Sequence, residues 1–170
     1  MSESLIELCR HNVWANERLF DACAVLSDAQ LDAGLVGAFG SIRSTLMHLT
    51  GAQERFAAAL AGTGPVEAIV ERGRFPGLTA LRTSTRASGK VLVGIAAHER
   101  PGATVATTWR GETYTLPTWM LLAQAIIHAA EHRTQVAAIL TQQGVEPPGM
   151  DVWTYHEAQF DGDWSQLWSS

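Results

Sequence analysis

Apolar residues recur every three or four positions along four long stretches of the chain, which is the spacing of one face of an α-helix. Ser41 is placed to cap the second stretch, and Gly62 is placed to end it. Pro117 suits the first turn of the fourth, which we expect to end at Gly144. The pattern therefore predicts four long helices over residues 4–26, 41–62, 79–98 and 117–144.

The segments between these stretches predict one further helical turn and a β-hairpin. The run from Ser27 to Gln30 has a capping-box pattern, and the glycine-rich segment after it is expected to be a loop. Residues 104–109 and 112–115 are rich in threonine, valine and aromatic residues, with Arg110-Gly111 between them. We therefore expect an all-α fold: a single domain, 1–170, built as a four-helix bundle with a short β-hairpin before the last long helix.

Charge and cysteine usage exclude several classes of partner. The chain of 170 residues carries a net charge of -5, and Lys90 is its only lysine. Nucleic acids and anionic membranes are therefore not expected as partners, since both favour basic surfaces. No apolar run is long enough to span a membrane, and the N-terminus lacks the pattern of a signal peptide. Cys9 and Cys23 lie about 21 Å apart in one predicted helix, too far for a disulfide, which favours a reducing, cytoplasmic location.

Two histidines in the fourth predicted helix are the strongest candidate for a functional site. His128 and His132 are four residues apart, so they lie on one helix face within an apolar stripe. His48, at the flank of the stripe in the second predicted helix, can complete a set of three ligands. Three imidazoles plus water suit Zn²⁺, Ni²⁺ or Fe²⁺ in an open, catalytic site. Histidines on apolar faces also occur as hydrogen-bonded core residues, and the spacing alone leaves both interpretations open.

The same residues overlap a second motif. His128, Glu131 and His132 have the H-x-x-E-H spacing of the inverted zinc peptidases, in which the glutamate is the general base. Such a peptidase needs a distant acidic ligand and a much larger body, so Glu131 is retained only as a candidate acid/base residue. The remaining histidines have no partner at ligand spacing and are expected at the surface or at helix caps: His11, His98 and His156.

Three stretches of the sequence carry a family resemblance. They are HNVWANERLFDACAVLSDAQL, FGSIRSTLMHLTGAQERF and TLPTWMLLAQAIIHAAEHRTQVAAILTQQGVEPPGMD, and their most specific pieces are Trp14-Ala15-Asn16 and the His-x-x-x-His-Arg-x-Gln run of 128–135. Together they resemble the DinB family of four-helix metal-binding proteins over nearly the whole chain. The resemblance implies that His48, His128 and His132 are the metal ligands. The chain departs from it at Glu131, where many relatives have histidine or asparagine.

The resemblance implies activity in broad terms only. Similar proteins include S-transferases and isomerases that use low-molecular-weight thiols, as well as metal-dependent hydrolases, and many are homodimers. We therefore expect a divalent-metal-dependent enzyme for a small-molecule substrate, with Zn²⁺ or Ni²⁺ ahead of Fe²⁺ or Mn²⁺. In the transferase, Arg133 is the candidate cation that binds the thiol; in the hydrolase, Glu131 carries the proton.

Two alternatives of another kind stay open. One is a non-catalytic dimeric bundle that binds a metal or a small molecule, and the other is a structural bundle with histidines in its core. The C-terminal tail is rich in aromatic residues and is expected to dock on the bundle or on a partner subunit; it contains Trp153, Tyr155, Trp164 and Trp168.

Overall fold

The computed structural model describes residues 3–64, 66–69, 73–109 and 111–159. The elements in these residues, in chain order, are α1 (Glu3–Cys23), α2 (Asp28–Leu31), α3 (Ile42–Ala61), α4 (Leu78–His98), β1 (Thr104–Trp109), β2 (Glu112–Pro117), α5 (Thr118–Gln142) and α6 (Val152–Gln159). The predicted all-α bundle, with a hairpin before the last long helix, is confirmed.

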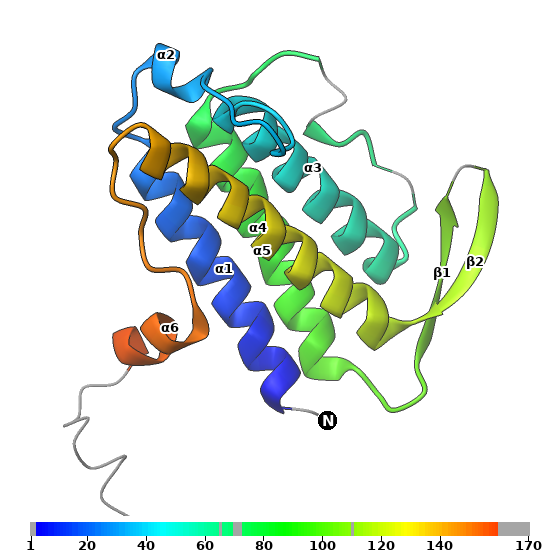
Figure 1. Ribbon diagram of the computed structural model, residues 1–170. Coiled ribbons are helices and arrows are strands. Elements are labelled where there is room, and N and C mark those ends of the chain that lie inside the picture. Colours follow the sequence, from blue (N-terminus) through cyan, green and yellow to red (C-terminus); the bar gives the residue numbers. More distant parts are fainter. Residues whose placement is uncertain (1–2, 65, 70–72, 110, 160–170) are drawn as a thin grey trace, which may run out of the picture.

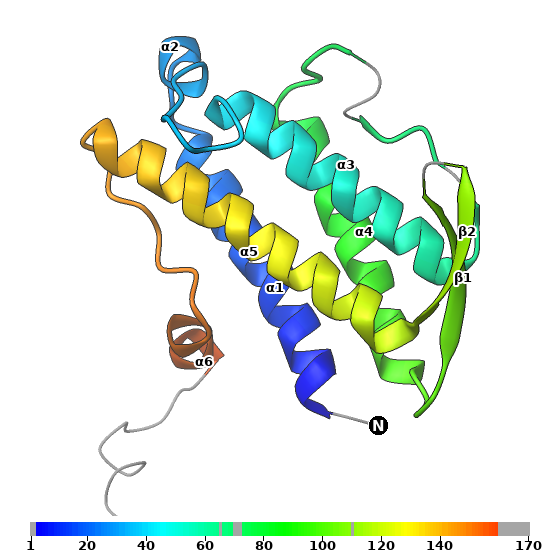
Figure 2. The ribbon, with the colours of Figure 1, turned by 45° about the vertical axis from the view of Figure 1, so that its right-hand side comes forward.

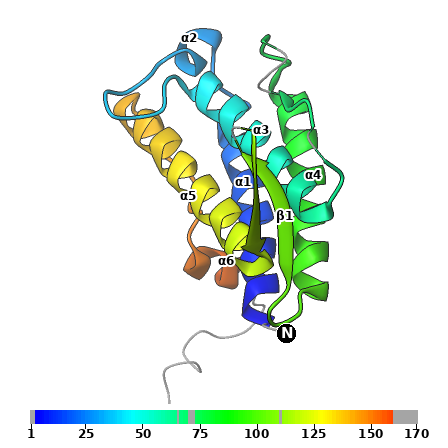
Figure 3. The same cartoon turned by 90° about the vertical axis from the view of Figure 1, so that its right-hand side faces the viewer.

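The long helices α1, α3, α4 and α5 pack side by side as a bundle (Figure 1). Both α1 and α3 contact α4 and α5, and Figure 2 shows α3 and α5 next to each other across one face. Strands β1 and β2 pair antiparallel, from Thr104 opposite Pro117 to Trp109 opposite Glu112. The hairpin contacts α3 through β1 and α5 through β2, and Figure 3 shows it in front of the helices, on the side turned toward the viewer. None of the described helices is long and apolar enough to span a membrane.

Most of the predicted helix ends are confirmed. Ser41 caps α3, with its Oγ accepting a hydrogen bond from the backbone N–H of Ser44, and Gly62 ends this helix in the left-handed region at φ 66°. Ser27 forms the predicted capping box at α2. The first helix differs from the prediction, because it begins before Ser4 and ends at Cys23. It stops early because the cap at Ser27 requires extended backbone just before α2.

Helix α6 was not predicted, although its start carries a recognisable signal. The carboxylate of Asp151 accepts hydrogen bonds from the backbone N–H and the hydroxyl of Thr154, at 2.9 and 2.8 Å. This is an N-cap arrangement, which supports a short helix even without a strong apolar stripe. The helix has no buried residue. The cap at Asp151 therefore indicates this helix better than the aromatic side chains of the tail do.

The tail docks on the bundle through α6 and α1. The ring of Tyr155 packs edge-on against Trp14 and His11, with centroids 5.3 and 5.5 Å apart. The expectation that His11 lies at the surface is wrong, because the tail covers it and its Nε2 lies 2.8 Å from the carbonyl oxygen of Met150. Trp153 is exposed, while Trp164 and Trp168 lie outside the described residues.

The core consists of two apolar clusters on either side of a polar layer. One cluster includes Phe20, Leu46 and Ile139, and the other includes Cys9 and Leu122. In each of the four long helices, the residues of the layer fall between residues of the two clusters along the chain. The polar layer is defined here as Asn12, Asn16, Gln53, Thr85 and Arg133, all of which are buried.

Hydrogen bonds join the polar layer across all four long helices. Nη1 of Arg133 donates to Oδ1 of Asn12 and of Asn16, at 2.6 and 2.8 Å. Both asparagines donate from Nδ2 to Oε1 of Gln53, whose Nε2 donates to the carbonyl oxygen of Thr85 at 2.7 Å. Since buried polar groups are costly unless paired, this chain of contacts is what makes a polar layer tolerable inside the bundle.

Candidate metal centre

Three histidine side chains converge between α3 and α5, the two helices that lie side by side in Figure 2. His48 comes from α3, and His128 and His132 come from α5, one turn apart. Nε2 of His128 lies 3.2 Å from Nε2 of His48 and 3.2 Å from Nε2 of His132. The ligand atoms of the three residues all lie within 4.8 Å of one another. The predicted grouping of these residues is confirmed, and it could hold a metal ion.

The spacing of the three nitrogens fits a common metal ion. Two nitrogens bound to Zn²⁺ at 2.0–2.1 Å and at a tetrahedral angle lie about 3.3 Å apart. The 3.2 Å between neighbouring Nε2 atoms matches that separation. Within the described residues, no cysteine or carboxylate joins the group. The ligand set is therefore three imidazoles, which suits Zn²⁺, Ni²⁺ and Fe²⁺.

Gln135 sets the tautomer of His132. Its Oε1 lies 2.9 Å from Nδ1 of His132 and also accepts the backbone N–H of Phe39 at 3.2 Å. An amide oxygen can only accept, so His132 carries its proton on Nδ1. Nε2 of His132 is then a free lone pair that faces the other two rings, as a metal ligand requires.

Burial keeps two of the imidazoles neutral. Loss of water around His128 lowers its pKa from 6.5 to about 4, and the charges of His132, His48 and Arg55 act in the same direction. Burial also lowers the pKa of His48, with His132 and Arg55 contributing. At neutral pH both rings are therefore uncharged, and an uncharged imidazole offers one nitrogen lone pair to a cation.

Two aromatic rings cover the histidines. Phe39, from the loop between α2 and α3, stacks on His48 with ring centroids 4.0 Å apart and an interplanar angle of 19°. The same ring meets His132 nearly edge-on at 5.4 Å. Phe56, two turns after His48 on α3, contacts His128 at 5.9 Å. All three imidazoles therefore have an aromatic neighbour, which limits their contact with water.

Among the described residues, Glu131 and Arg133 make no hydrogen bond, ion pair or ring contact with the three histidines. Glu131 is exposed, because one step along α5 from His132 turns the side chain toward solvent. Arg133 is only 3% exposed, and its guanidinium donates to Asn12 and Asn16 of α1. Burial lowers its pKa to about 10, which still leaves it charged at neutral pH.

Sequence reasoning missed three residues around the histidines. Phe56 follows the apolar spacing of its helix and looks like a core residue in the sequence, and nothing in a glycine-rich loop singles out Phe39. Arg55 follows His48 by seven residues, which returns it to the same helix face two turns on. A search of α3 for residues at this spacing would have found Arg55, whose charge acts on both His48 and His128.

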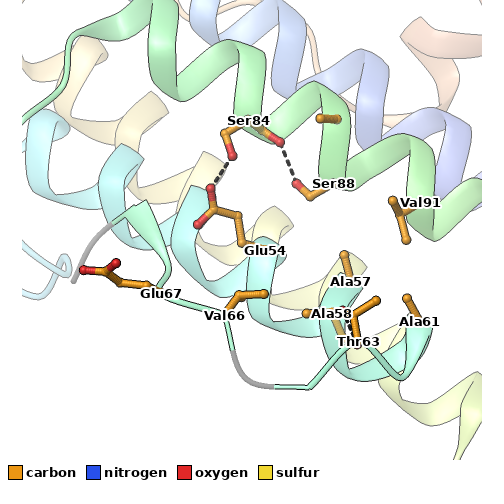
Figure 4. Close-up of a pocket in the computed structure, with 11 residues that line it drawn as sticks. Glu54, Ala57, Ala58, Ala61, Thr63, Val66, Glu67, Ser84, Ser88 and Val91 are labelled. Atoms are coloured by element: carbon orange, nitrogen blue, oxygen red, sulfur yellow. Dashed lines mark hydrogen bonds between the residues drawn. The ribbon is translucent and has the colours of Figure 1, made fainter. Parts of the chain in front are cut away.

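A separate pocket of about 400 Å³ opens between α3 and α4 (Figure 4). Small residues such as Ala57 and Ala61 line it, with Glu54 and Ser84 at one side. Glu54 accepts hydrogen bonds from the hydroxyl of Ser84 and from the backbone N–H of Ile69, the latter at 2.6 Å. Both carboxylate oxygens of Glu54 therefore accept hydrogen bonds from other parts of the chain. No histidine of the cluster lines this pocket.

Comparison with known proteins identifies a family. The model of the DinB family matches residues 1–166, which is nearly the whole chain. No curated protein matches the sequence significantly.

Proposed function

The chain belongs to the DinB family, and we propose on that premise that it is an enzyme whose His48, His128 and His132 hold a divalent metal ion. The observation that carries this proposal is the convergence of three Nε2 atoms from two helices, two pairs of which lie 3.2 Å apart, close to the separation of nitrogens bound to one ion. Imidazole ligands favour Zn²⁺ or Ni²⁺, with Fe²⁺ and Mn²⁺ as further candidates.

The proposed reaction is the transfer of a low-molecular-weight thiol to a small electrophile. A divalent ion held by three neutral ligands keeps its full charge, and it would lower the pKa of a bound thiol or water. In the transfer, the thiol sulfur bonds to a carbon of the acceptor, the leaving group departs with its electron pair, and the thiol proton goes to water. A thiol brings its own nucleophile, which suits a group of histidines that no described carboxylate joins.

The residues around the histidines have defined tasks in this proposal. Gln135 fixes the proton of His132 on Nδ1, and Phe39 and Phe56 exclude water from the rings. The role of Arg133 in binding the thiol stays a prediction, while its hydrogen bonds to α1 favour a role in positioning α5. Arg55 is the arginine whose charge lowers the pKa values of His48 and His128, after burial and His132.

Metal content tests the first part of the proposal. Purified protein is loaded with Zn²⁺ or Ni²⁺, freed of excess ion and analysed for metal. We expect about one ion per chain, and loss of that ion in His48→Ala, His128→Ala and His132→Ala. His98→Ala is the matched control, because this exposed histidine bonds only to the carbonyl oxygen of its own helix in the contacts described. Equal metal content in all five proteins would refute the site.

The reaction is tested with a panel of small thiols and an activated aryl halide as acceptor. We expect thiol-dependent product from the loaded wild type and none from His132→Ala. The second candidate is a metal-dependent hydrolase that uses Glu131 as acid/base, and this role of Glu131 stays a prediction. Hydrolysis without thiol that is abolished in Glu131→Gln would replace the transferase with the hydrolase.

A non-catalytic bundle that binds metal or a small molecule is the outcome if metal binds but neither reaction is found. The homodimer and the cytoplasmic location also stay predictions. Sedimentation equilibrium of the purified chain measures its mass directly: twice the mass of one chain supports the dimer, and the mass of a single chain excludes it.

A further inference from the structure

The loop that carries Phe39 is closed at its base. Gly34 and Ser41 form an isolated antiparallel bridge, and the N–H of Ile42 donates to the carbonyl oxygen of Ala33 at 3.1 Å. A Cβ on Gly34 would lie 3.1 Å from the carbonyl oxygen of Gly40, which shows how closely the two ends of the loop approach. The loop is therefore held at both ends, and residues 35–39 form its tip.

The tip is also held to α5 at the histidines. The backbone N–H of Phe39 donates to Oε1 of Gln135, the atom that accepts from His132. One side of the Phe39 ring stacks on His48, yet 50% of the residue is exposed. Phe39 is thus a fixed aromatic wall that contacts two of the three histidines and also faces solvent, where an incoming molecule would meet it.

The surface of this tip is apolar. Leu35 and Val36 are 37% and 101% exposed, and with Phe39 they give the loop three exposed large apolar side chains. A substrate group that lies against such a surface is stabilised if it is apolar, because it leaves water, whereas a polar group gains little. The loop can therefore discriminate between molecules that bind the same ion through the same atom.

We propose that Phe39 is a specificity-determining residue: among small thiols that bind at the three histidines, it favours those with a compact apolar group next to the sulfur. This inference rests on the proposed function, since it assumes that a thiol binds there. In this proposal Phe39 determines which thiols are preferred, and the three histidines bind the metal ion.

The test uses the Co²⁺-loaded protein, in which binding of a thiol is followed by sulfur-to-cobalt absorbance. Wild type, Phe39→Ala and Phe39→Leu are each titrated with 2-mercaptoethanol and with benzyl mercaptan. The ratio of the two dissociation constants is compared between proteins, so differences in thiol acidity cancel. Tyr114→Ala is the matched control, because Tyr114 is a partly exposed aromatic residue on the hairpin, with 40% exposure.

We expect the wild type to prefer benzyl mercaptan, and this preference to fall roughly fivefold in Phe39→Ala, the size of a lost aromatic contact. The affinity for 2-mercaptoethanol should change little, Phe39→Leu should be intermediate, and Tyr114→Ala should behave as wild type. An unchanged preference in Phe39→Ala, or an equal loss of affinity for both thiols, would overturn the role of Phe39 alone. Loss of Co²⁺ uptake in both Phe39→Ala and Phe39→Leu would also overturn it, because the ring would then be needed to hold the metal site in place. Failure of the wild type to take up Co²⁺ would instead overturn the proposed function, and this inference with it.

Discussion

Nδ1 of His132 lies 2.9 Å from Oε1 of Gln135, almost one turn further along α5. The pair is local in sequence, so the orientation of this imidazole does not depend on how α3 and α5 pack. The same oxygen also accepts a hydrogen bond from the backbone N–H of Phe39, which links the loop to His132. An outer partner of this kind raises the basicity of the imidazole and holds its ring in place.

Replacing Gln135 with leucine removes this partner while keeping the side chain close in size. We expect Gln135→Leu to bind Zn²⁺ about 10- to 100-fold more weakly, as for other residues that orient metal-binding histidines. Competition with a chromogenic chelator measures the affinity. Gln142→Leu, an exposed position near the end of the same helix, is the control and should match the wild type. Equal affinities for all three proteins would show that Gln135 does not support the site.

Acid should destabilise the metal-free protein. In the folded chain the pKa of His128 is lowered from 6.5 to about 4, and the pKa values of His48 and His11 are also lowered. Between these values the unfolded chain binds protons that the folded chain does not, so the free energy of unfolding falls as the pH falls from about 6.5 toward 4. Urea titrations at pH 7, 6 and 5 measure the effect.

The variant His128→Ala should lose part of this pH dependence, because the imidazole of His128 then binds no proton in either the folded or the unfolded chain. The slope that remains belongs to His48, His11 and the carboxylates. An identical fall of the urea midpoint in the wild type and in His128→Ala would contradict the assignment of a lowered pKa to this ring.

Two glycines of α4 should respond in opposite ways to alanine. A Cβ on Gly89 would meet Cγ2 of Val13 on α1 at 2.7 Å, so Gly89→Ala forces the two helices apart and destabilises the fold by about 1–3 kcal/mol. A Cβ on Gly94 meets nothing within 4 Å, so Gly94→Ala should stabilise by about 1 kcal/mol through helix propensity. Thermal melts of both variants provide the comparison, and a gain in stability for Gly89→Ala would show that α1 and α4 tolerate more separation.

The contacts of Arg133 predict an effect on stability. Arg133→Met removes the donor to Asn12 and Asn16 and leaves two buried acceptors unpaired, which should cost about 1–3 kcal/mol. Arg86→Met, at a half-exposed ion pair with Glu17, should change the urea midpoint little. Weaker thiol binding in Arg133→Met with unchanged stability would instead favour the predicted role of Arg133 in binding the thiol.

Local patterns explain why most of the fold could be predicted from the sequence. Ser27, Ser41 and Gly62 each act within a few residues of themselves, so their roles are visible without knowledge of the fold. The pairing of His128 with His132 is local in the same sense. The approach of His48 could be predicted because its helix places it beside the apolar stripe that packs against the rest of the bundle.

What could not be predicted depends on contacts between distant parts of the chain. Phe39 reaches the histidines through the path of an irregular loop, which has no periodicity to follow. The burial of His11 depends on a C-terminal segment that returns to cover α1. Helical angles predict that Glu131 lies near His128, whereas the structure exposes its side chain to solvent. A carboxylate without a buried partner is more stable in water.

The polar layer also fixes the axial alignment of the helices, which an all-apolar core would leave less sharply defined. Sliding α3 by one turn against α1 and α5 would shift it by about 5.4 Å and separate Gln53 of α3 from both asparagines of α1. The same slip would carry His48 beyond reach of His128, because their nitrogens are only 3.2 Å apart. The hydrogen bonds of the polar layer involve none of the three histidines. They nevertheless fix the position along the bundle at which the three imidazoles can meet.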